Sequence, residues 1–215
     1  MSTLRRASLA DFDRVVVTLV RAFDADPLIR FMLPDDAAYR EWQGSTYFRL
    51  VARPWFDHGE VWVTDDVVAV SVWGAPNPPR RSETLRAELI ALFERFDADL
   101  RARMSTVAGA LKTLKPAEPH WYLQFLGTHP DWQRCGLGSI LSSVASERCD
   151  RGGIVQFLET STEDDVAFYS SRGFQVSDTL TITAPDLTAR DGGGTQQQAS
   201  WPTEVTVTTM IRLPK

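Results

Sequence analysis

Residues 133–139 read Q-R-C-G-L-G-S, with two glycines, Gly136 and Gly138, two positions apart. The preceding residues 121–128 alternate like a β-strand, whereas the apolar residues of 137–149 recur at helical spacing. The first N–H groups of a helix have no partner inside it, and the helix dipole places partial positive charge there. Glycine removes the Cβ that would keep an anion away from the backbone. The sequence therefore predicts a strand, a glycine-bearing turn and a helix that together bind a phosphate.

Two other phosphate-binding motifs do not fit this loop. A dinucleotide fingerprint requires a third glycine, but the position that it would occupy holds Leu141. A Walker loop ends in Gly-Lys-Ser or Gly-Lys-Thr, whereas Gly138 is followed directly by Ser139. A nucleotide-binding module is therefore disfavoured. The remaining pattern, Gln-x-x-Gly-x-Gly, is weak when taken alone, because an ordinary helix start can have the same residues.

The composition is that of an acidic protein with an ordinary hydrophobic core. Of the 215 residues 43% are hydrophobic, the formal net charge is −5 and the pI is about 5.2. This length predicts one domain over residues 1–215, and the negative charge disfavours nucleic acid or an anionic membrane as the main partner. No apolar run approaches a membrane span, and the N-terminus lacks the apolar core of a signal peptide.

The cysteines and histidines carry no metal or disulfide pattern. Cys135 and Cys149 make no disulfide framework, so we expect a reducing, cytoplasmic location. The three histidines, His58, His120 and His129, are not spaced with cysteines or carboxylates as zinc ligands are. We therefore expect no metal site.

Hydrophobic periodicity predicts a mixed α/β fold. Helices are expected at residues 11–23, 37–56, 137–149 and 164–172, and a long helix begins at residue 82, with its continuation to residue 114 interrupted at Gly109. Strands are expected at residues 3–7, 60–64, 67–73, 121–128, 154–158, 174–183 and 205–213. Residues 28–36 are expected to form a loop. Residues 185–202 contain G-G-G and Q-Q-Q without apolar periodicity, which predicts a flexible insertion before the last strand.

Strand order places the chemistry at one edge of the sheet. Strands 121–128 and 154–158 are joined by one helix and should therefore be parallel. Ligands of such units bind outside the carboxyl ends of the strands. Residues 126–128, the glycine loop and residues 159–161 are therefore expected around one crevice.

Three segments together resemble the GNAT acetyltransferase superfamily. H-W-Y-L-Q-F-L-G-T-H-P-D-W-Q-R-C-G-L-G-S (residues 120–139) is similar to its central strand and coenzyme loop. F-L-E-T-S (residues 157–161) is similar to its fifth strand, and F-Y-S-S-R-G-F (residues 168–174) to its Tyr-x-x-x-Gly-Phe element. The resemblance covers residues 60–73 and 116–176. Within the superfamily it is strongest to the branch that acetylates puromycin.

This resemblance implies the GNAT fold, a mixed sheet of about seven strands flanked by helices, and acetyl-CoA as the acyl donor. Carried over residue by residue, it implies a coenzyme site made of Leu126, Gly127, Thr128, Gln133, Arg134, Cys135, Gly136, Leu137, Gly138, Ser139 and Asp165. The sequence departs from the family pattern in the loop and in the last helix. The two variable loop positions, usually small and basic, are Arg134 and Cys135, and Asp165 stands where asparagine is common.

The resemblance also implies direct transfer, in which an amine attacks the thioester while both substrates are bound. Tyr169 matches the family's usual acid, which protonates the departing thiolate, and a backbone N–H near Leu126 or Gly127 would stabilise the oxyanion. A phenol of pKa about 10 is near a thiol of about 8.5, so this proton transfer is not badly mismatched. Without the neighbouring motifs, Tyr169 would be interpreted as a packing residue at a helix end.

Glu159 is the candidate base. It ends a buried strand at the mouth of the crevice, where a carboxylate is costly unless it has a task. A salt bridge or a helix cap is the alternative role. Gln124 is a weaker candidate for orienting the acceptor, and Phe31 and Trp42 are candidates for the wall of the substrate pocket. Cys135 has no nearby histidine base and is interpreted as structural.

The predicted reaction is acetylation of a primary amine of a small molecule, such as an antibiotic or aminonucleoside. A protein or peptide N-acetyltransferase is one alternative, although it needs an open groove. A non-catalytic acyl-CoA sensor is the other, and loss of Tyr169 would have favoured it. The sequence leaves open whether the protein is a monomer or a homodimer.

Overall fold

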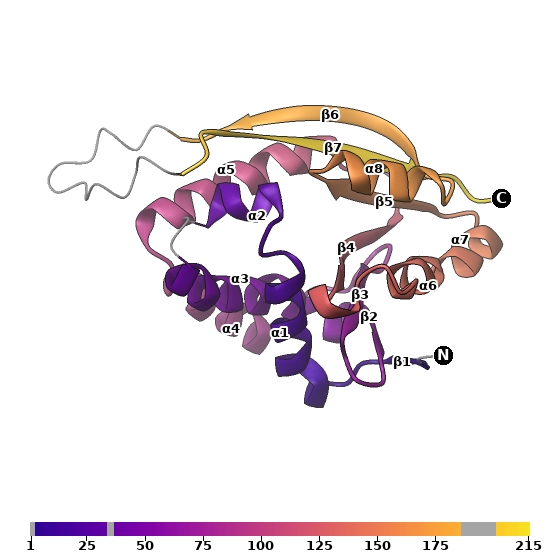
Figure 1. The fold of residues 1–215 in the computed structure, drawn as a ribbon, viewed down its shortest axis with the longest axis horizontal. Helices are drawn as coiled ribbons and strands as arrows, with labels where there is room; N and C mark the ends of the chain where they lie inside the picture. The colour runs from indigo at the N-terminus through magenta and orange to yellow at the C-terminus, as the bar shows by residue number, and fades with distance from the viewer. Residues whose placement is uncertain (1–2, 34–36, 186–200) are drawn as a thin grey trace, which may run out of the picture.

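The computed structural model describes residues 3–33, 37–185 and 201–215 (Figure 1). The strands are β1 (Leu4–Arg6), β2 (Gly59–Thr64), β3 (Ala69–Gly74), β4 (His120–Thr128), β5 (Val155–Thr160), β6 (Gln175–Thr183) and β7 (Glu204–Arg212). The α-helices are α1 (Phe12–Ala22), α2 (Pro27–Met32), α3 (Ala37–His58), α4 (Glu83–Glu94), α5 (Ala98–Leu114), α6 (Leu137–Ser143), α7 (Ser146–Gly152) and α8 (Glu163–Ser170). Two short 3-10 helices are η1 (Leu9–Asp11) and η2 (Pro130–Trp132).

Within the described residues, seven strands form one mixed sheet in the order β1-β2-β3-β4-β5-β7-β6. The β4–β5 pair is parallel and the other five pairs are antiparallel. The predicted fold class and the predicted parallel pair are therefore confirmed. A single domain over residues 1–215 stays a prediction.

The two faces of the sheet carry different helices. The larger hydrophobic cluster packs α1, α2, α3 and α5 against one face, through side chains such as Leu19, Phe48 and Val72. A second cluster packs α7 and α8 against the other face, where Leu123, Leu158 and Tyr169 meet. Figure 1 shows the first group of helices mainly to the left of β2, β3 and β4, and α6 and α7 to the right of these strands.

The centre of the sheet opens where β4 and β5 diverge. Their parallel register runs from His120↔Val155 to Leu123↔Leu158 and then stops. Beyond it, β4 pairs with β3 alone, and the β3–β4 register shifts by one residue so that Gln124 is the extra residue of a bulge. Glu159 and Thr160 of β5 continue to pair with β7. The carboxyl ends of the two central strands therefore separate, as the crevice prediction requires.

The loop predicted at residues 28–36 is wrong in its first part, because Pro27–Met32 is the helix α2. The side chain of Asp26 caps this helix by accepting a hydrogen bond from the backbone N–H of Ile29 at 2.8 Å. Proline is favourable at the first position of a helix, since its missing N–H would have no partner there. Asp26-Pro27 is therefore a helix start.

Two predicted helices are broken. The helix expected from residue 82 is α4 followed by α5, and the break lies at residues 95–97, while Gly109 is inside α5. Asp97 caps α5 by accepting from the N–H of Leu100 at 2.8 Å. The helix expected at 137–149 is α6 and α7. There the hydroxyls of Ser142 and Ser143 donate to carbonyls three residues earlier, which competes with helical hydrogen bonding.

Two remaining predictions concern the insertion before the last strand and the absence of a membrane-spanning segment. The insertion expected at 185–202 falls on residues 186–200, which lie outside the described residues. In the part of the chain that the structure describes, no helix combines the length and the apolar character that a membrane crossing requires.

Candidate active site

The glycine loop connects β4 to α6 with two left-handed residues. After η2, Arg134 has a φ of 62° and Gly136 a φ of 82°. Gly136 is the N-cap of α6, and a side chain there would be strained in this conformation. Gln133 fixes the base of the loop by donating from Nε2 to the carbonyl of Thr128 at 3.2 Å. The predicted strand–turn–helix unit is therefore present.

The backbone of this loop offers hydrogen-bond donors. Among the described residues, none accepts from the backbone N–H groups of residues 134–139. A Cβ at Gly136 would meet no protein atom within 4 Å, so the space in front of the turn is open. Free N–H groups at a helix start with open space before them fit the phosphate oxygens of a coenzyme.

The other glycine, Gly138, lies near α8. A Cβ there would lie 3.7 Å from the ring of Phe168, an ordinary van der Waals distance, so packing against α8 does not require glycine. Leu137 is buried, and Cys135 is exposed with its thiol 3.5 Å from the carbonyl of Gln133.

An arginine that the sequence reading missed lies beside the loop. The guanidinium of Arg172 lies 3.5 Å from the centre of the Phe168 ring and donates to the hydroxyl of Ser139. It also donates to the Phe168 carbonyl at 2.6 Å. Arg172 is the residue before Gly173 in the Tyr-x-x-x-Gly-Phe element, which gave it no assigned role. The structure shows that it links α8 to the first turn of α6.

Tyr169 is buried on the side of the sheet that α7 and α8 cover. Its ring packs edge-on against Phe168 at 5.1 Å and against Phe174 at 5.6 Å. Burial is the main cause that raises the pKa of Tyr169 above its usual value, and the carboxylate of Asp165 adds to it. The phenol is therefore protonated throughout the physiological pH range, as an acid must be.

Asp165 lies in the first turn of α8 and is already hydrogen bonded. Its Oδ2 accepts from the hydroxyl of Thr162 at 2.7 Å and from that of Thr160 at 3.1 Å. Its backbone N–H donates to the Thr162 hydroxyl at 3.1 Å. These contacts place Asp165 in the cap that joins the end of β5 to α8.

Glu159 is held on one side of its carboxylate only. Its Oε2 accepts from the phenol of Tyr122 on β4 at 2.5 Å. Its Oε1 is buried and, within the described residues, has no hydrogen-bond partner. Burial raises the pKa of Glu159, while the cation of Lys115 and the Tyr122 hydrogen bond act in the opposite direction. Within the described residues, Glu159 therefore makes neither the salt bridge nor the helix cap that was its alternative role.

Glu159 and Tyr169 belong to opposite faces of the sheet. Side chains alternate along a strand, and Leu158 and Thr160 face α8, so Glu159 faces the helices α1 to α5. Tyr169 packs in the same cluster as Leu123 and Leu158, the last pair of the parallel register. The two candidate catalytic groups are thus separated by the sheet and adjoin it where β4 and β5 diverge.

The other predicted site residues on β4 are Gln124, Leu126, Gly127 and Thr128. Gln124 is half-buried at the bulge. Gly127 is buried under α1, where an added Cβ would lie 3.0 Å from the Cβ of Ala22. Leu126 is half-buried and packs against the second and third clusters, which include residues of α6 to α8. Thr128 ends the strand beneath the glycine loop.

The two predicted wall residues lie apart from this arrangement. Phe31 is fully buried, and its carbonyl accepts from Arg103 at 2.7 Å, with the guanidinium 5.0 Å from its ring. Trp42 on α3 is 50% exposed. No described contact joins either residue to Glu159, so their role in substrate binding stays a prediction.

Two groups that contact or face Glu159 were missed from the sequence. Tyr122 belongs to the strand that carries Gln124, and its aromatic character suggested only packing. Lys115 follows α5, and its ammonium lies 3.8 Å from the centre of the Tyr122 ring. Although Lys115 is exposed as a residue, desolvation of the ammonium lowers its pKa. Only the fold brings Lys115, Tyr122 and Glu159 together, because they come from three separate segments.

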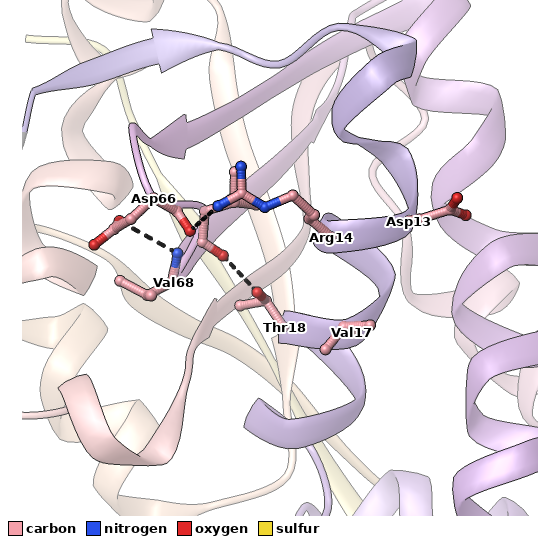
Figure 2. Close-up of a pocket in the computed structure, with 7 residues that line it drawn as sticks. Asp13, Arg14, Val17, Thr18, Asp66 and Val68 are labelled. Carbon is pink, nitrogen blue, oxygen red and sulfur yellow. Dashed lines mark hydrogen bonds between the residues drawn. The ribbon is translucent and has the colours of Figure 1, made fainter.

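A shallow pocket of about 290 Å³ lies elsewhere, between α1 and the β2–β3 turn (Figure 2). Figure 2 shows Arg14 donating to the carbonyl of Asp66 at 2.6 Å and the Thr18 hydroxyl donating to that of Val67. None of the predicted site residues lines this pocket. The described residues also contain no group of three or more His, Cys, Asp and Glu side chains that could hold a metal ion.

A model of the acetyltransferase (GNAT) family matches residues 35–174, which is more than half of the sequence. The chain belongs to this family. It is therefore an acetyl-CoA-dependent N-acetyltransferase, and the predicted family and enzyme class are confirmed.

Solved structures of acetyltransferases share the fold of this GNAT enzyme. One, from Corynebacterium glutamicum and described as histone acetyltransferase HPA2 and related acetyltransferase, is 23% identical with a TM-score of 0.65, and the match covers 100% of this chain and 98% of that one. An agmatine N-acetyltransferase is 16% identical with a TM-score of 0.61, over 98% of each chain. The polyamine N-acetyltransferase of Drosophila melanogaster is 15% identical with a TM-score of 0.60, over 99% of this chain and 100% of that one.

Proposed function

We propose that this GNAT enzyme moves an acetyl group from acetyl-CoA to a primary amine of a small molecule by direct attack. The observation that carries the proposal is the placement of Glu159 and Tyr169 on the two faces of the sheet where β4 and β5 diverge. A proton acceptor on one face and a proton donor on the other suit a reaction in which amine and thioester meet between them.

The glycine loop would hold the coenzyme. The free N–H groups of residues 134–139 fit its pyrophosphate, and Arg134 and Arg172 are cations beside them. Coenzyme A supplies the activated acetyl thioester. Cys135 is exposed and lies in this loop without a histidine base, so we assign it no part in the chemistry.

The chain's own groups would manage two protons. Glu159 takes one from the acceptor ammonium, because an ammonium has no lone pair with which to attack. Tyr169 gives one to the departing sulfur as the carbon–sulfur bond breaks, and it is reprotonated through solvent as the nitrogen loses its second proton to form the amide. A backbone N–H near Leu126 or Gly127 would stabilise the oxyanion. One N-acetyl product, one coenzyme thiol and one proton result from each acetyl-CoA and ammonium consumed.

The acceptor is proposed as a small amine. The neighbouring structures named above are an agmatine and a polyamine N-acetyltransferase, and another is an arylalkylamine N-acetyltransferase from Aedes aegypti. The sequence resemblance adds puromycin as an acceptor to test.

An amine panel scored by coenzyme A release tests the proposal. It should include agmatine, a polyamine, an arylalkylamine, puromycin, an aminoglycoside and a peptide with a free N-terminus. Because Cys135 is an exposed free thiol, each thiol-reagent assay needs a blank without amine. We expect at least one small amine to accelerate release. Acceleration by the peptide alone would identify a peptide N-acetyltransferase, and acetyl-CoA binding without acceleration by any amine of the panel would contradict the proposed acceptor class.

A further inference from the structure

The carboxylate of Glu159 has one oxygen engaged and one oxygen free. Tyr122 donates to Oε2 at 2.5 Å, which is short for a hydrogen bond between oxygens. The buried Oε1 accepts from no described residue. A buried acceptor without a partner is costly, so its persistence beside a satisfied oxygen suggests that a ligand completes it.

Tyr122 is itself fixed in place. Its ring packs against Phe157 at 5.8 Å and Trp55 at 6.5 Å. The Lys115 ammonium lies 3.8 Å from the centre of the Tyr122 ring, which is a cation–π contact. With the ring held by these contacts, the phenol hydrogen is directed at Oε2. This fixes the rotation of the Glu159 carboxylate.

The charges around Glu159 come from several elements. Lys115, after α5, is the cation that faces it. Tyr122 from β4 and Tyr47 from α3 are phenols whose pKa values burial raises, so both are neutral. Thr209 of β7 is paired with Glu159 and carries no charge. The carboxylate of Asp26 also acts on the Tyr47 phenol, and burial raises the pKa of Asp26 itself.

We propose that Tyr122 and Lys115 are positioning residues that hold Glu159 as an oriented carboxylate, with Oε1 as the atom that takes the proton of the acceptor amine. This rests on the proposed function. In the step itself the ammonium N–H bond breaks, an O–H bond forms at Oε1, and the nitrogen keeps the electron pair that then attacks the thioester. Glu159 returns its proton to water after the transfer. Tyr122 keeps its proton throughout, since that proton is the donor that orients Oε2.

The test compares five variants by two measurements. Tyr122→Phe removes the hydroxyl and keeps the ring, Lys115→Met removes the charge, and Lys115→Arg restores it. Tyr47→Phe is the matched control, because it removes a buried phenol that makes no described hydrogen bond to Glu159. Glu159→Gln is the reference. The measurements are the acid limb of kcat/KM against pH, and the titration of the Glu159 carboxyl followed by 13C NMR in the ligand-free protein.

We expect Tyr122→Phe and Lys115→Met to move both the acid limb and the carboxyl titration to higher pH, by about one unit each. Lys115→Arg should restore both values, and Tyr47→Phe should leave both in place. A carboxyl titration that stays unchanged in Tyr122→Phe and Lys115→Met overturns the positioning proposal. Lys115 is exposed, so its variants should fold even if Tyr122→Phe does not.

The same data separate this inference from the proposed function. If Glu159→Gln keeps the acid limb, Glu159 is not the base, and the assignment of Oε1 as proton acceptor is overturned with it. If Glu159→Gln loses the limb while the positioning variants leave it unmoved, the base stands and only the role of Tyr122 and Lys115 is overturned.

Discussion

Glu159 and Tyr169 lie on opposite faces of the sheet, beside the last pair of the parallel β4–β5 register. The tyrosine is covered by α8 next to the glycine loop, and the glutamate faces α3 and the end of α5. In the proposed mechanism, Tyr169 therefore lies on the side of the coenzyme and Glu159 on the side of the amine. If the proposed mechanism is correct, a change at one residue should affect one half of the reaction and leave the binding of the other substrate intact.

Replacing Tyr169 with phenylalanine tests the acid. Tyr169→Phe keeps the ring that packs on Phe168 and Phe174, so folding and coenzyme affinity should change little. We expect kcat to fall by roughly 10²–10⁴-fold, the usual contribution of one general acid. The loss should shrink with acyl donors that have a better leaving group. Near-normal turnover where chemistry limits the rate would remove the acid role, and loss of coenzyme binding would make Tyr169 a packing residue.

Glu159→Gln tests the base through the pH profile. Glu159 acts as a carboxylate, so activity is lost as the pH falls through its pKa. Burial raises that pKa, which places the acid limb above the ordinary glutamate value of about 4.3. The variant should lose this limb while its affinity for acetyl-CoA, measured by calorimetry, stays unchanged. A profile identical to that of the parent enzyme would leave Glu159 with a structural role.

A charged side chain at Gly136 tests the coenzyme loop. Gly136→Asp places a carboxylate before the free N–H groups of residues 134–139, and calorimetry should no longer detect acetyl-CoA binding. Gly153→Asp is the matched control, because Gly153 also has a left-handed φ, 62°, and open space around it, but lies at the end of α7. Both variants should carry similar strain. Equal coenzyme affinity in the two folded variants would contradict the loop assignment.

The ion pair between Arg5 and Asp11 should make stability depend on pH. Asp11 is buried and accepts from the Arg5 guanidinium at 2.8 Å through each oxygen, which lowers its pKa. A lowered carboxyl pKa stabilises the fold above the unfolded value of about 3.9 and loses this effect as the pH falls. Asp11→Asn should cost about 1–2 kcal/mol at pH 7 and less in acid, by chemical denaturation.

Asp13→Asn provides the comparison for that measurement. Asp13 also pairs with an arginine, Arg49, at 2.6 Å, but its side chain is 77% exposed. Exposed pairs contribute little, so its substitution should change stability by less than about 0.5 kcal/mol at either pH. A cost equal to that of Asp11→Asn would show that burial and the second hydrogen bond are not what makes the Arg5 pair stabilising.

The glycine loop and the positions of the strands along the chain could be predicted from the sequence because their signals are local. Gly136 and Gly138 lie within one helix turn, and strand alternation repeats every second residue. Asp26-Pro27 also carries a local signal, yet the same two residues fit a helix end and a helix start. Which one applies depends on whether the residues after Pro27 are buried, and α2 buries Phe31 and Met32.

The surroundings of Glu159 could not be predicted, because they are assembled from segments far apart in the sequence. Tyr122 and Lys115 acquire their roles only when β4, β5 and the end of α5 meet. The sequence shows a tyrosine in an apolar strand and a lysine before a proline, and each has an ordinary structural interpretation. The free oxygen of Glu159 is visible only once these partners are placed.

The divergence of β4 and β5 creates an edge strand inside a sheet. In the described part of the chain, residues 125–128 pair with β3 and with no second strand. An exposed edge at the rim of a sheet invites another protein chain to add to it, and proteins usually protect such edges. In the proposed function, the extended coenzyme, with amide groups of its own, would pair with this edge as a short extra strand.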